Sequence, residues 1–389
     1  MNNVSREKIR NLNRQNAINT FYGKSEVSKS DIMERTGLCA ATVGTLIDDL
    51  LKEGLISEER FAASGGGRRP MLYTLNEGFY YVLVYQIDTE GVSVSLFDMF
   101  SKMVASKSLA RTMQGPESVT KGIALVTENL KAGSSALFPH VRYIGVSMPG
   151  IMHYSTSVVT FSNPLKLQDF SLLDVFKELF PDRTIPVRVF KDTDAMIYGE
   201  YFENGAVSDS MAYILCKEGV GFSVITRGKL YWNDDCSMEL GYTVIDYKTG
   251  KRAGQLLGIH HLVERYVDLL QVSHPEVLPN LSEIDFPYVC ARYNEGDLDA
   301  RQAVSDQIEA IVCLAANVAN LFNPKKIVIG GYFSLFLQGD ALERKVKERV
   351  LSPFAKDLEV TCGRLETSLS LKGMSEAITK ESFFKTIKL

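Results

Sequence analysis

The chain has 389 residues, of which 45% are hydrophobic and 23% charged, so it is long enough for two or three globular domains. Its formal net charge of −4 gives no sign of nucleic-acid binding by the chain as a whole. The charge is uneven, because residues 1–77 carry 11 Lys and Arg against 10 Asp and Glu, while the rest carries 32 against 37.

The six cysteines are scattered without a CxxC pair, which is typical of reduced thiols and argues against a disulfide or zinc framework. The N-terminus is polar and lacks the apolar segment of a signal peptide. No apolar run approaches the roughly 18 residues that span a bilayer. We therefore expect a cytoplasmic protein with no membrane contact.

Residues 13–61 show the pattern of helix, helix, turn, helix and wing. Ser28 and Asp31 have the spacing of a capping box that starts a short helix, and Gly37 supplies the turn after it. The next helix carries an apolar stripe whose spacing places every member on one face. The members of this stripe are Val43, Leu46, Ile47, Leu50 and Leu51. The residues that follow predict a two-stranded wing and a linker.

A short helix, a glycine turn and a second amphipathic helix describe a helix-turn-helix, whose second helix lies in the major groove of double-stranded DNA. The exposed residues at the start of that helix are small, so direct readout of bases is expected to be thin. Two arginines after a run of glycines are expected to enter a narrow minor groove. The predicted DNA-binding residues are Ser28, Lys29, Ala40, Ala41, Thr42, Thr45, Arg68 and Arg69. A protein-interaction module with the same three helices is the alternative.

Beyond this unit, strands and helices recur in an order that predicts two α/β lobes facing each other across a cleft. Three strand-like runs fill residues 80–110, a helix follows at 117–132, and a second set of strands begins at Met211. A cleft between two lobes is the usual place for a small-molecule site. The predicted boundaries are a winged helix-turn-helix at 1–64, a linker at 65–79, a first lobe at 80–193 together with about 373–389, and a second lobe at 194–372.

Seven motifs follow one another along the chain: "TGLCAATVGTLIDDLLKEGLI", "GGGRRPMLYTL", "IGVSMPG", "VFKDTDAMIYGEY", "EGVGFSVITRGKLY", "ELGY" and "IVIGG". In this order they resemble the ROK family of repressors, open reading frames and sugar kinases, on the repressor branch of the N-acetylglucosamine and xylose repressors. The resemblance extends from Asn13 to about Glu381. It implies an actin-like, hexokinase-like two-lobe fold of the ribonuclease H-like type, a sugar in the cleft, and a homodimer or homotetramer.

The two loops that hold phosphate in the kinases of this family are altered here. At the first, Gln86 stands where the resemblance places the catalytic-loop Asp, and Asp88 and Glu90 stand in the segment where glycines are expected. Glycine is needed there so that backbone N–H groups can cradle anionic oxygens. At the second loop, Ser223 replaces a glycine and Glu218 adds negative charge. We interpret both as ordinary hairpins and expect no ATP site, no catalytic residue and no cofactor.

The resemblance also implies sugar-binding residues. Asp192 matches the general base of the family's N-D-A-N segment, although Lys191 and Asp194 replace its asparagines. A carboxylate at a strand end can accept hydrogen bonds from sugar hydroxyls without performing chemistry, and the alternative is that Asp192 caps the next helix. Glu239 matches the family's E-x-G-H segment, in which Tyr242 replaces the histidine. The expected sugar-binding set is Asn163, Asp192, Glu239, Tyr242 and Glu264.

The cysteine-rich segment that binds zinc in the family reads "GKRAGQLLGIHH" here and contains no cysteine, so we expect no metal. Three aromatic residues, Tyr154, Phe161 and Trp232, are candidates for stacking on a sugar, with core packing as the alternative.

These features predict a sugar-responsive, DNA-binding transcriptional repressor of carbohydrate metabolism, in which a ligand in the cleft shifts the population of two lobe arrangements. A repressor controlled by a protein partner is one alternative. An active ATP-dependent sugar kinase is a second, and the missing loop glycines argue against it.

Overall fold

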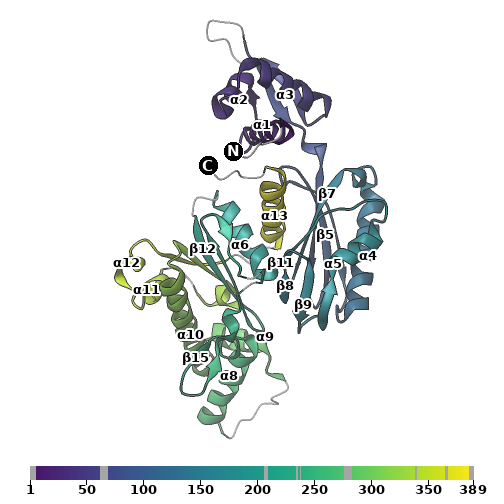
Figure 1. Cartoon of the computed structure of the whole chain (residues 1–389). Coiled ribbons are helices and arrows are strands. Elements are labelled where there is room, and N and C mark those ends of the chain that lie inside the picture. Colours follow the sequence, from purple (N-terminus) through teal and green to yellow (C-terminus); the bar gives the residue numbers. More distant parts are fainter. Residues whose placement is uncertain are drawn as a thin grey trace.

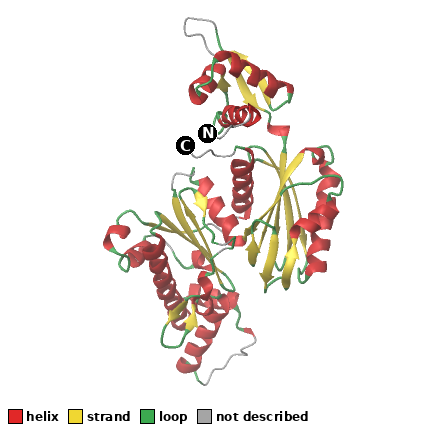
Figure 2. Ribbon diagram, viewed as in Figure 1, coloured by secondary structure: helices red, strands yellow, loops and turns green. Residues whose placement is uncertain are grey.

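In the computed structural model, the described residues are 6–61, 69–205, 209–233, 235–236, 238–275, 283–337, 340–363 and 367–384. They form an N-terminal unit of helices with a small sheet, and two larger lobes that each contain a five-stranded sheet (Figures 1 and 2). The N-terminal unit lies at one end of the molecule, next to the first lobe and to the end of the last helix (Figure 1).

The N-terminal unit packs three helices against a three-stranded antiparallel sheet of order β1-β3-β2. Four members of the predicted apolar stripe are buried in its core, and Leu51 is half-buried, so the predicted face of this helix is confirmed. The elements are α1 (Arg6–Asn19), β1 (Val27–Ser28), α2 (Lys29–Thr36), α3 (Ala40–Lys52), β2 (Ile56–Phe61) and β3 (Met71–Leu75).

The ends of α2 follow the sequence prediction closely. The Ser28 hydroxyl accepts the N–H of Asp31 at 3.2 Å, and the Asp31 carboxylate accepts the N–H of Ser28 at 2.7 Å, which completes a capping box. Gly37 ends the helix with φ of 67°, a left-handed conformation that costs glycine little. The capping box and the glycine turn are therefore confirmed.

Replacing Ser28 by Ala is expected to lower the free energy of unfolding of the N-terminal unit by about 1 kcal/mol, because the N-cap acceptor is lost. Ser30 is exposed two residues further along the chain and provides the matched control. Ser30→Ala is expected to change the free energy of unfolding by less than about 0.5 kcal/mol. Urea unfolding followed by circular dichroism measures both. Equal destabilisation by the two variants would contradict the capping role.

The prediction of a linker at residues 65–79 is wrong for residues 71–75, which form strand β3. Strand β3 pairs with β2, with Ile56 opposite Leu75, and also with β1, with Val27 opposite Tyr73. Backbone hydrogen bonding and burial of Leu75 therefore place residues 71–75 in the N-terminal unit, and the boundary predicted after residue 64 is too early.

The first lobe is built on a mixed sheet of order β11-β7-β4-β5-β6, in which β4, β7 and β11 are parallel. Helix α4 packs on β5 and β6, and a small antiparallel sheet of order β10-β9-β8 extends the lobe. The strands are β4 (Tyr81–Ile87), β5 (Gly91–Asp98), β6 (Met103–Ala110), β7 (Val141–Met148), β8 (Ile151–His153), β9 (Val158–Ser162), β10 (Leu167–Ser171) and β11 (Val187–Lys191). The helices are η1 (Glu77–Phe79), α4 (Pro116–Ser134), η2 (Phe138–His140) and α5 (Leu172–Leu179).

The second lobe has a sheet of order β14-β13-β12-β17-β18, and α10 is the long helix packed beside α8, α9 and α11. Its strands are β12 (Ser210–Cys216), β13 (Val220–Thr226), β14 (Lys229–Leu230), β15 (Val244–Asp246), β16 (Lys251–Arg252), β17 (Lys326–Gly331) and β18 (Glu359–Cys362). Its helices are η3 (Leu240–Tyr242), α7 (Ala253–Leu256), α8 (Ile259–Ser273), α9 (Phe286–Glu295), α10 (Leu298–Phe322), η5 (Tyr332–Leu335), α11 (Ala341–Lys347) and α12 (Ser352–Ala355).

Two helices lie side by side between the lobes: α6 (Asp192–Glu203) and α13 (Thr367–Ile378) (Figure 1). Their close approach requires glycine on both, because a Cβ at Gly373 would lie 2.3 Å from the backbone nitrogen of Gly199. Helix α13 also packs on β4 and β7 of the first lobe, and it continues into the π-helical turn η6 (Thr379–Phe383). The C-terminal element thus starts at Thr367, earlier than the predicted boundary near residue 373.

Candidate functional site

The junction between β11 and α6 places several charged side chains next to each other. Lys191 ends the strand with its side chain buried, and its Nζ lies 2.5 Å from Oε1 of Glu239, which comes from the loop before η3. The same ammonium donates to the carbonyl oxygen of Met238 at 3.4 Å. Two candidate sugar-site segments that are 48 residues apart in the chain are therefore joined by an ion pair.

Asp194 organises the start of α6. Its Oδ2 accepts the backbone N–H of Lys191 at 2.9 Å and the hydroxyl of Tyr154 at 2.6 Å. Its Oδ1 accepts the hydroxyl of Ser223, from β13, at 2.6 Å. Burial raises the pKa of Asp194, and these hydrogen bonds act in the opposite direction. One buried carboxylate thus ties both lobes to the helix start.

Asp192 is the first residue of α6 and is half-buried. Its carboxylate accepts a local hydrogen bond, from the N–H of Thr193 to Oδ1 at 2.8 Å. Burial raises its pKa, and the nearby Lys191 and Lys217 offset part of this shift. The backbone N–H of the N-cap residue is satisfied by Asp194 rather than by Asp192, so the helix start does not depend on Asp192 as a cap.

The hairpin of β12 and β13 approaches Asp192 very closely. A Cβ at Gly221 would lie 2.6 Å from Cγ2 of Thr193 and 3.9 Å from Oδ1 of Asp192. Seven residue pairs join these two strands in one antiparallel register, from Ser210–Thr226 to Cys216–Val220, which confirms the predicted hairpin. Gly221 is therefore a packing requirement of the site.

On the first lobe, the loop after β7 faces the turn between β9 and β10. Ser162 donates its hydroxyl to the carbonyl oxygen of Pro149 at 2.7 Å, and Gly150 has φ of 141° against the backbone of Phe161. Asn163 follows directly and is exposed, with its carbonyl oxygen accepting the N–H of Lys166. The side chain of this expected sugar-binding residue is thus exposed beside the loop at Gly150.

Two expected sugar-binding residues have exposed side chains on the second lobe. The ring of Tyr242 is 64% exposed and is covered by the guanidinium of Arg252, 4.9 Å from its centroid. Glu264 is on α8, where its side chain is 72% exposed and lies 3.5 Å from His261. Both side chains thus lie at the surface of the second lobe, and their contact with a sugar stays a prediction.

Two of the three candidate stacking residues contact each other. The rings of Tyr154 and Trp232 are 5.2 Å apart at an interplanar angle of 31°. Trp232 is 39% exposed, whereas Tyr154 is partly buried and bonded to Asp194. Phe161 is 47% exposed on β9. Sequence reasoning named these rings but did not anticipate that one would connect to the buried carboxylate of α6.

The first loop compared with the phosphate loop of kinases is closed by its own side chain. Oδ1 of Asp88 accepts the backbone N–H groups of Glu90 and Gly91, each at 2.9 Å. These are the type of donors that a phosphate loop leaves open for anionic oxygens. A Cβ at Gly91 would lie 2.5 Å from the carbonyl oxygen of Leu109, so this glycine serves sheet packing. The hairpin interpretation of this turn is confirmed by the pairing of β4 with β5.

In the N-terminal unit, the expected DNA-binding residues fall into distinct environments. Ala40, Ala41 and Thr45 are exposed on α3, and Thr42 is half-buried, with its hydroxyl 3.3 Å from Sγ of Cys39. Lys29 lies over α3, since a Cβ at Gly44 would be 3.0 Å from its Nζ.

Of the other three expected DNA contacts, the structure describes Ser28 and Arg69. Ser28 is buried and engaged in the capping box, which corrects its assignment as a DNA contact. Arg69 is exposed just before β3, and Arg68 lies outside the described residues.

Two kinds of feature are absent from the part of the chain that the structure describes. No group of three or more His, Cys, Asp and Glu side chains is arranged to hold a metal ion there. Among the same residues, no helix is both long and apolar enough to cross a membrane.

The profile of the ROK family matches residues 87–381, and the chain belongs to this family. The xylose repressor of Caldicellulosiruptor bescii is 24% identical to it over 358 residues, which cover 87% of either chain. The xylose repressor of Bacillus subtilis is 23% identical over 378 residues, covering 95% of either chain. The DNA-binding transcriptional dual regulator NagC of Escherichia coli is 23% identical, covering 87% of this chain and 86% of NagC.

Solved structures share the fold. A ROK family transcriptional regulator, a homologue of the E. coli MLC protein, superposes with a TM-score of 0.79 at 19% identity and covers 96% of this chain and 97% of its own. A ROK family glucokinase from Streptomyces griseus, in complex with glucose and AMPPNP, superposes with a TM-score of 0.61 at 19% identity and covers 76% of this chain and 98% of its own. The two lobes therefore have the actin-like architecture of this family.

Proposed function

We propose that this protein is a sugar-responsive, DNA-binding transcriptional repressor of carbohydrate metabolism that has lost kinase activity. The observation that carries the proposal is the difference between the surroundings of two aspartates in the ROK domain. Among the described residues, the half-buried carboxylate of Asp192 at the start of α6 accepts a hydrogen bond from the adjacent N–H of Thr193, whereas Asp88 occupies the backbone donors of the first loop. A domain with these two sites is suited to bind a hydroxyl-rich ligand and poorly suited to hold the phosphates of ATP.

The N-terminal unit is proposed to be a winged helix-turn-helix. Helix α3 exposes small residues at its start, Ala40, Ala41 and Thr45, so its backbone can approach the floor of a major groove closely. Lys29 beside Gly44 and the exposed Arg69 supply positive charge for phosphate and minor-groove contacts. Binding would then depend strongly on salt and modestly on base sequence at α3. The repressor names of several relatives support this assignment.

The ligand is proposed to bind beside Asp192, Glu239 and Asn163, between the lobes. Burial makes the ionised form of Asp192 unfavourable, so hydrogen-bond donors from a ligand stabilise it. Sugar hydroxyls supply such donors. In a homodimer, a ligand that changes the lobe arrangement would change the spacing of two N-terminal units on DNA. A roughly 100-fold preference for the released arrangement supplies about 2.7 kcal/mol to this switch.

A thermal-shift screen of the full chain tests the proposal, using neutral sugars, sugar acids, sugar phosphates and ATP with Mg²⁺. Ligands that bind the native state raise the melting temperature by mass action. Stabilisation by one sugar class, without an effect of ATP, is the expected result. Stabilisation by ATP would contradict the loss of the phosphate site, and a lack of any shift would favour control by a protein partner.

Replacing Lys191 by Asn, the residue type of the family's kinases, is expected to strengthen binding of a neutral sugar about fivefold. The reason is that Glu239 must leave its ion pair before it can accept sugar hydroxyls, and a partly exposed pair costs about 1 kcal/mol to break. Isothermal titration with the sugar found in the screen measures the change. Lys217→Asn, which removes a second positive charge near Asp192, is the control. Weaker binding by the Lys191 variant would show that Lys191 contacts the ligand itself.

A further inference from the structure

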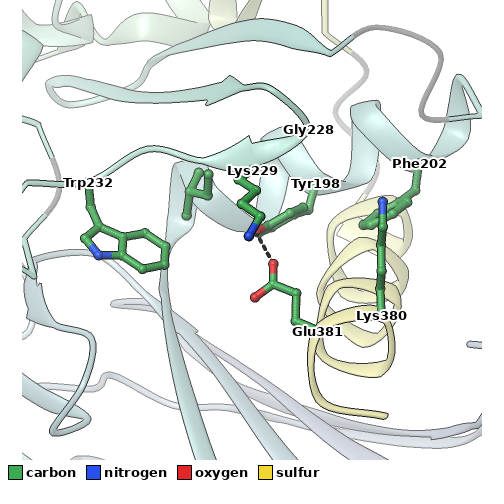
Figure 3. A pocket seen from close by; sticks show the side chains of 8 residues that line it. Tyr198, Phe202, Gly228, Lys229, Trp232, Lys380 and Glu381 are labelled. Atoms are coloured by element: carbon green, nitrogen blue, oxygen red, sulfur yellow. Dashed lines mark hydrogen bonds between the residues drawn. The ribbon is translucent and has the colours of Figure 1, made fainter. Parts of the chain in front are cut away.

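A hollow lies beside α6 and η6, and we call it the C-terminal groove. Trp232, Leu230 and Glu381 line both of its parts, which have volumes of about 440 and 240 Å³. Neither Asp192 nor Glu239 lines it, whereas the candidate stacking residues Tyr154 and Trp232 do. Figure 3 shows Trp232 and Phe202 at opposite ends, with Lys229, Tyr198 and Glu381 between them. Its size is that of a small-molecule site.

The side chain of Glu381 places a carboxylate of the protein itself in the groove. One carboxylate oxygen lies 2.5 Å from the guanidinium of Arg188, on β11, and the other accepts the hydroxyl of Tyr198, on α6, at 3.0 Å. Arg188 is oriented by the ring of Phe190, whose centroid is 5.0 Å from its Cζ. A guanidinium and a phenol directed at one carboxylate form a ready oxyanion site.

The surroundings of Glu381 favour an anion that carries a ring. Lys229 and Lys380 line the larger part of the groove, and Asp235 lines the smaller part, where it is engaged by Ser155 and His153. Trp232 is 39% exposed and offers a flat apolar face beside these charges. A head group with the chemistry of Glu381, attached to a ring that stacks on an indole, matches both features.

We propose that the C-terminal groove is a second ligand site for a small ring-bearing phosphate or carboxylate, which competes with Glu381 for Arg188 and Tyr198. This competition would change the contact between the C-terminal segment and the N-terminal unit. Glu381 belongs to η6, and the carbonyl oxygens of Phe383 and Phe384 just after it accept Nε2 of Gln15, on α1, at 2.8 and 3.1 Å. A ligand that displaces Glu381 therefore releases the segment that holds α1.

Trp232 is the only tryptophan in the chain, so its fluorescence reports on this groove. The probes are phenyl phosphate and benzoate, with benzyl alcohol as the neutral analogue and the full chain as the protein. Saturable changes with an anionic probe, and none with benzyl alcohol, are expected. Glu381→Gln, which removes the competing charge but keeps an acceptor for Tyr198, should bind the probe about tenfold more tightly. Arg188→Gln should lose binding, and Asp192→Asn should bind like the wild type.

Response to phenyl phosphate alone would assign the site to phosphate esters, and response to benzoate alone would assign it to carboxylates. The proposal is overturned if no anionic probe binds the wild type or Glu381→Gln, or if benzyl alcohol binds equally well. If Arg188→Gln does not fold, the ratio of affinities between Glu381→Gln and the wild type decides, and a ratio near one rejects competition. None of these outcomes depends on DNA or on a sugar in the cleft.

Discussion

Asp192→Asn is expected to weaken binding of the sugar effector by roughly 10- to 100-fold, because hydrogen bonds to a charged group contribute about 1.5–3 kcal/mol. The same change is expected to raise the melting temperature of the ligand-free protein. Burial disfavours the ionised form of Asp192, and the isosteric amide avoids that cost. Calorimetric titration and thermal unfolding of the same samples measure the two effects.

The pH dependence gives an independent check on Asp192. Its pKa is raised in the folded state, so the unfolded chain loses this proton first as the pH rises. Ionisation therefore costs native stability once the pH exceeds the unfolded value, and the cost reaches its full size above the folded value. Asp192→Asn should lack this part of the pH dependence. A variant that binds sugar normally, or that is less stable than the wild type near neutral pH, would contradict the assignment.

Asp194→Ala is expected to lower the free energy of unfolding by about 3 kcal/mol. The substitution removes the acceptor of the N–H of Lys191 and of the Tyr154 hydroxyl, and it leaves the Ser223 hydroxyl with Thr193 alone as an acceptor. Asp194→Asn is the matched control, because its amide oxygen can accept at Oδ2 while its NH₂ donates to Ser223, and it should cost less than about 1 kcal/mol.

Urea unfolding observed through Trp232 measures the loss locally, since Trp232 stacks on Tyr154 and Tyr154 donates to Asp194. A lower midpoint for Asp194→Ala than for Asp194→Asn is the expected order. Equal midpoints would mean that the three donors find water or other partners, and that Asp194 does not organise the start of α6.

Local sequence rules predicted the local structure well. The apolar stripe of α3, the capping box of α2 and the turn at Gly37 each depend on residues within one or two helical turns, and the structure contains all three. The hairpin at Asp88 belongs to the same class, because an Asp at the start of a turn accepts N–H groups two and three residues ahead. Two paired strands were predicted after α3, and β2 and β3 pair in this way, but the boundary predicted after residue 64 separated β3 from its partners, which lie on the other side of the glycine-rich segment in the sequence.

The candidate site was predicted only in part, because side-chain direction depends on distant packing. Asp192 and Glu239 were placed near each other through the family resemblance, but the ion pair of Lys191 with Glu239 joins positions 48 residues apart. Tyr242 belongs to the same motif as Glu239, and Glu264 lies beyond it in the sequence, and both have exposed side chains on the second lobe. The carboxylate of Glu381 meets Arg188 across 193 residues, and no spacing rule in the sequence reports such a contact.

The most direct test of the repressor account is release of DNA by a sugar. The full chain is used to select duplexes from a random DNA library, and fluorescence anisotropy then follows the selected duplex while the sugar identified by thermal shift is added. We expect the sugar to lower the DNA affinity of the wild type about 100-fold and to have little effect on Asp192→Asn at the same concentration. Failure to retain any duplex, or equal DNA affinity of the wild type with and without the sugar, would contradict the account.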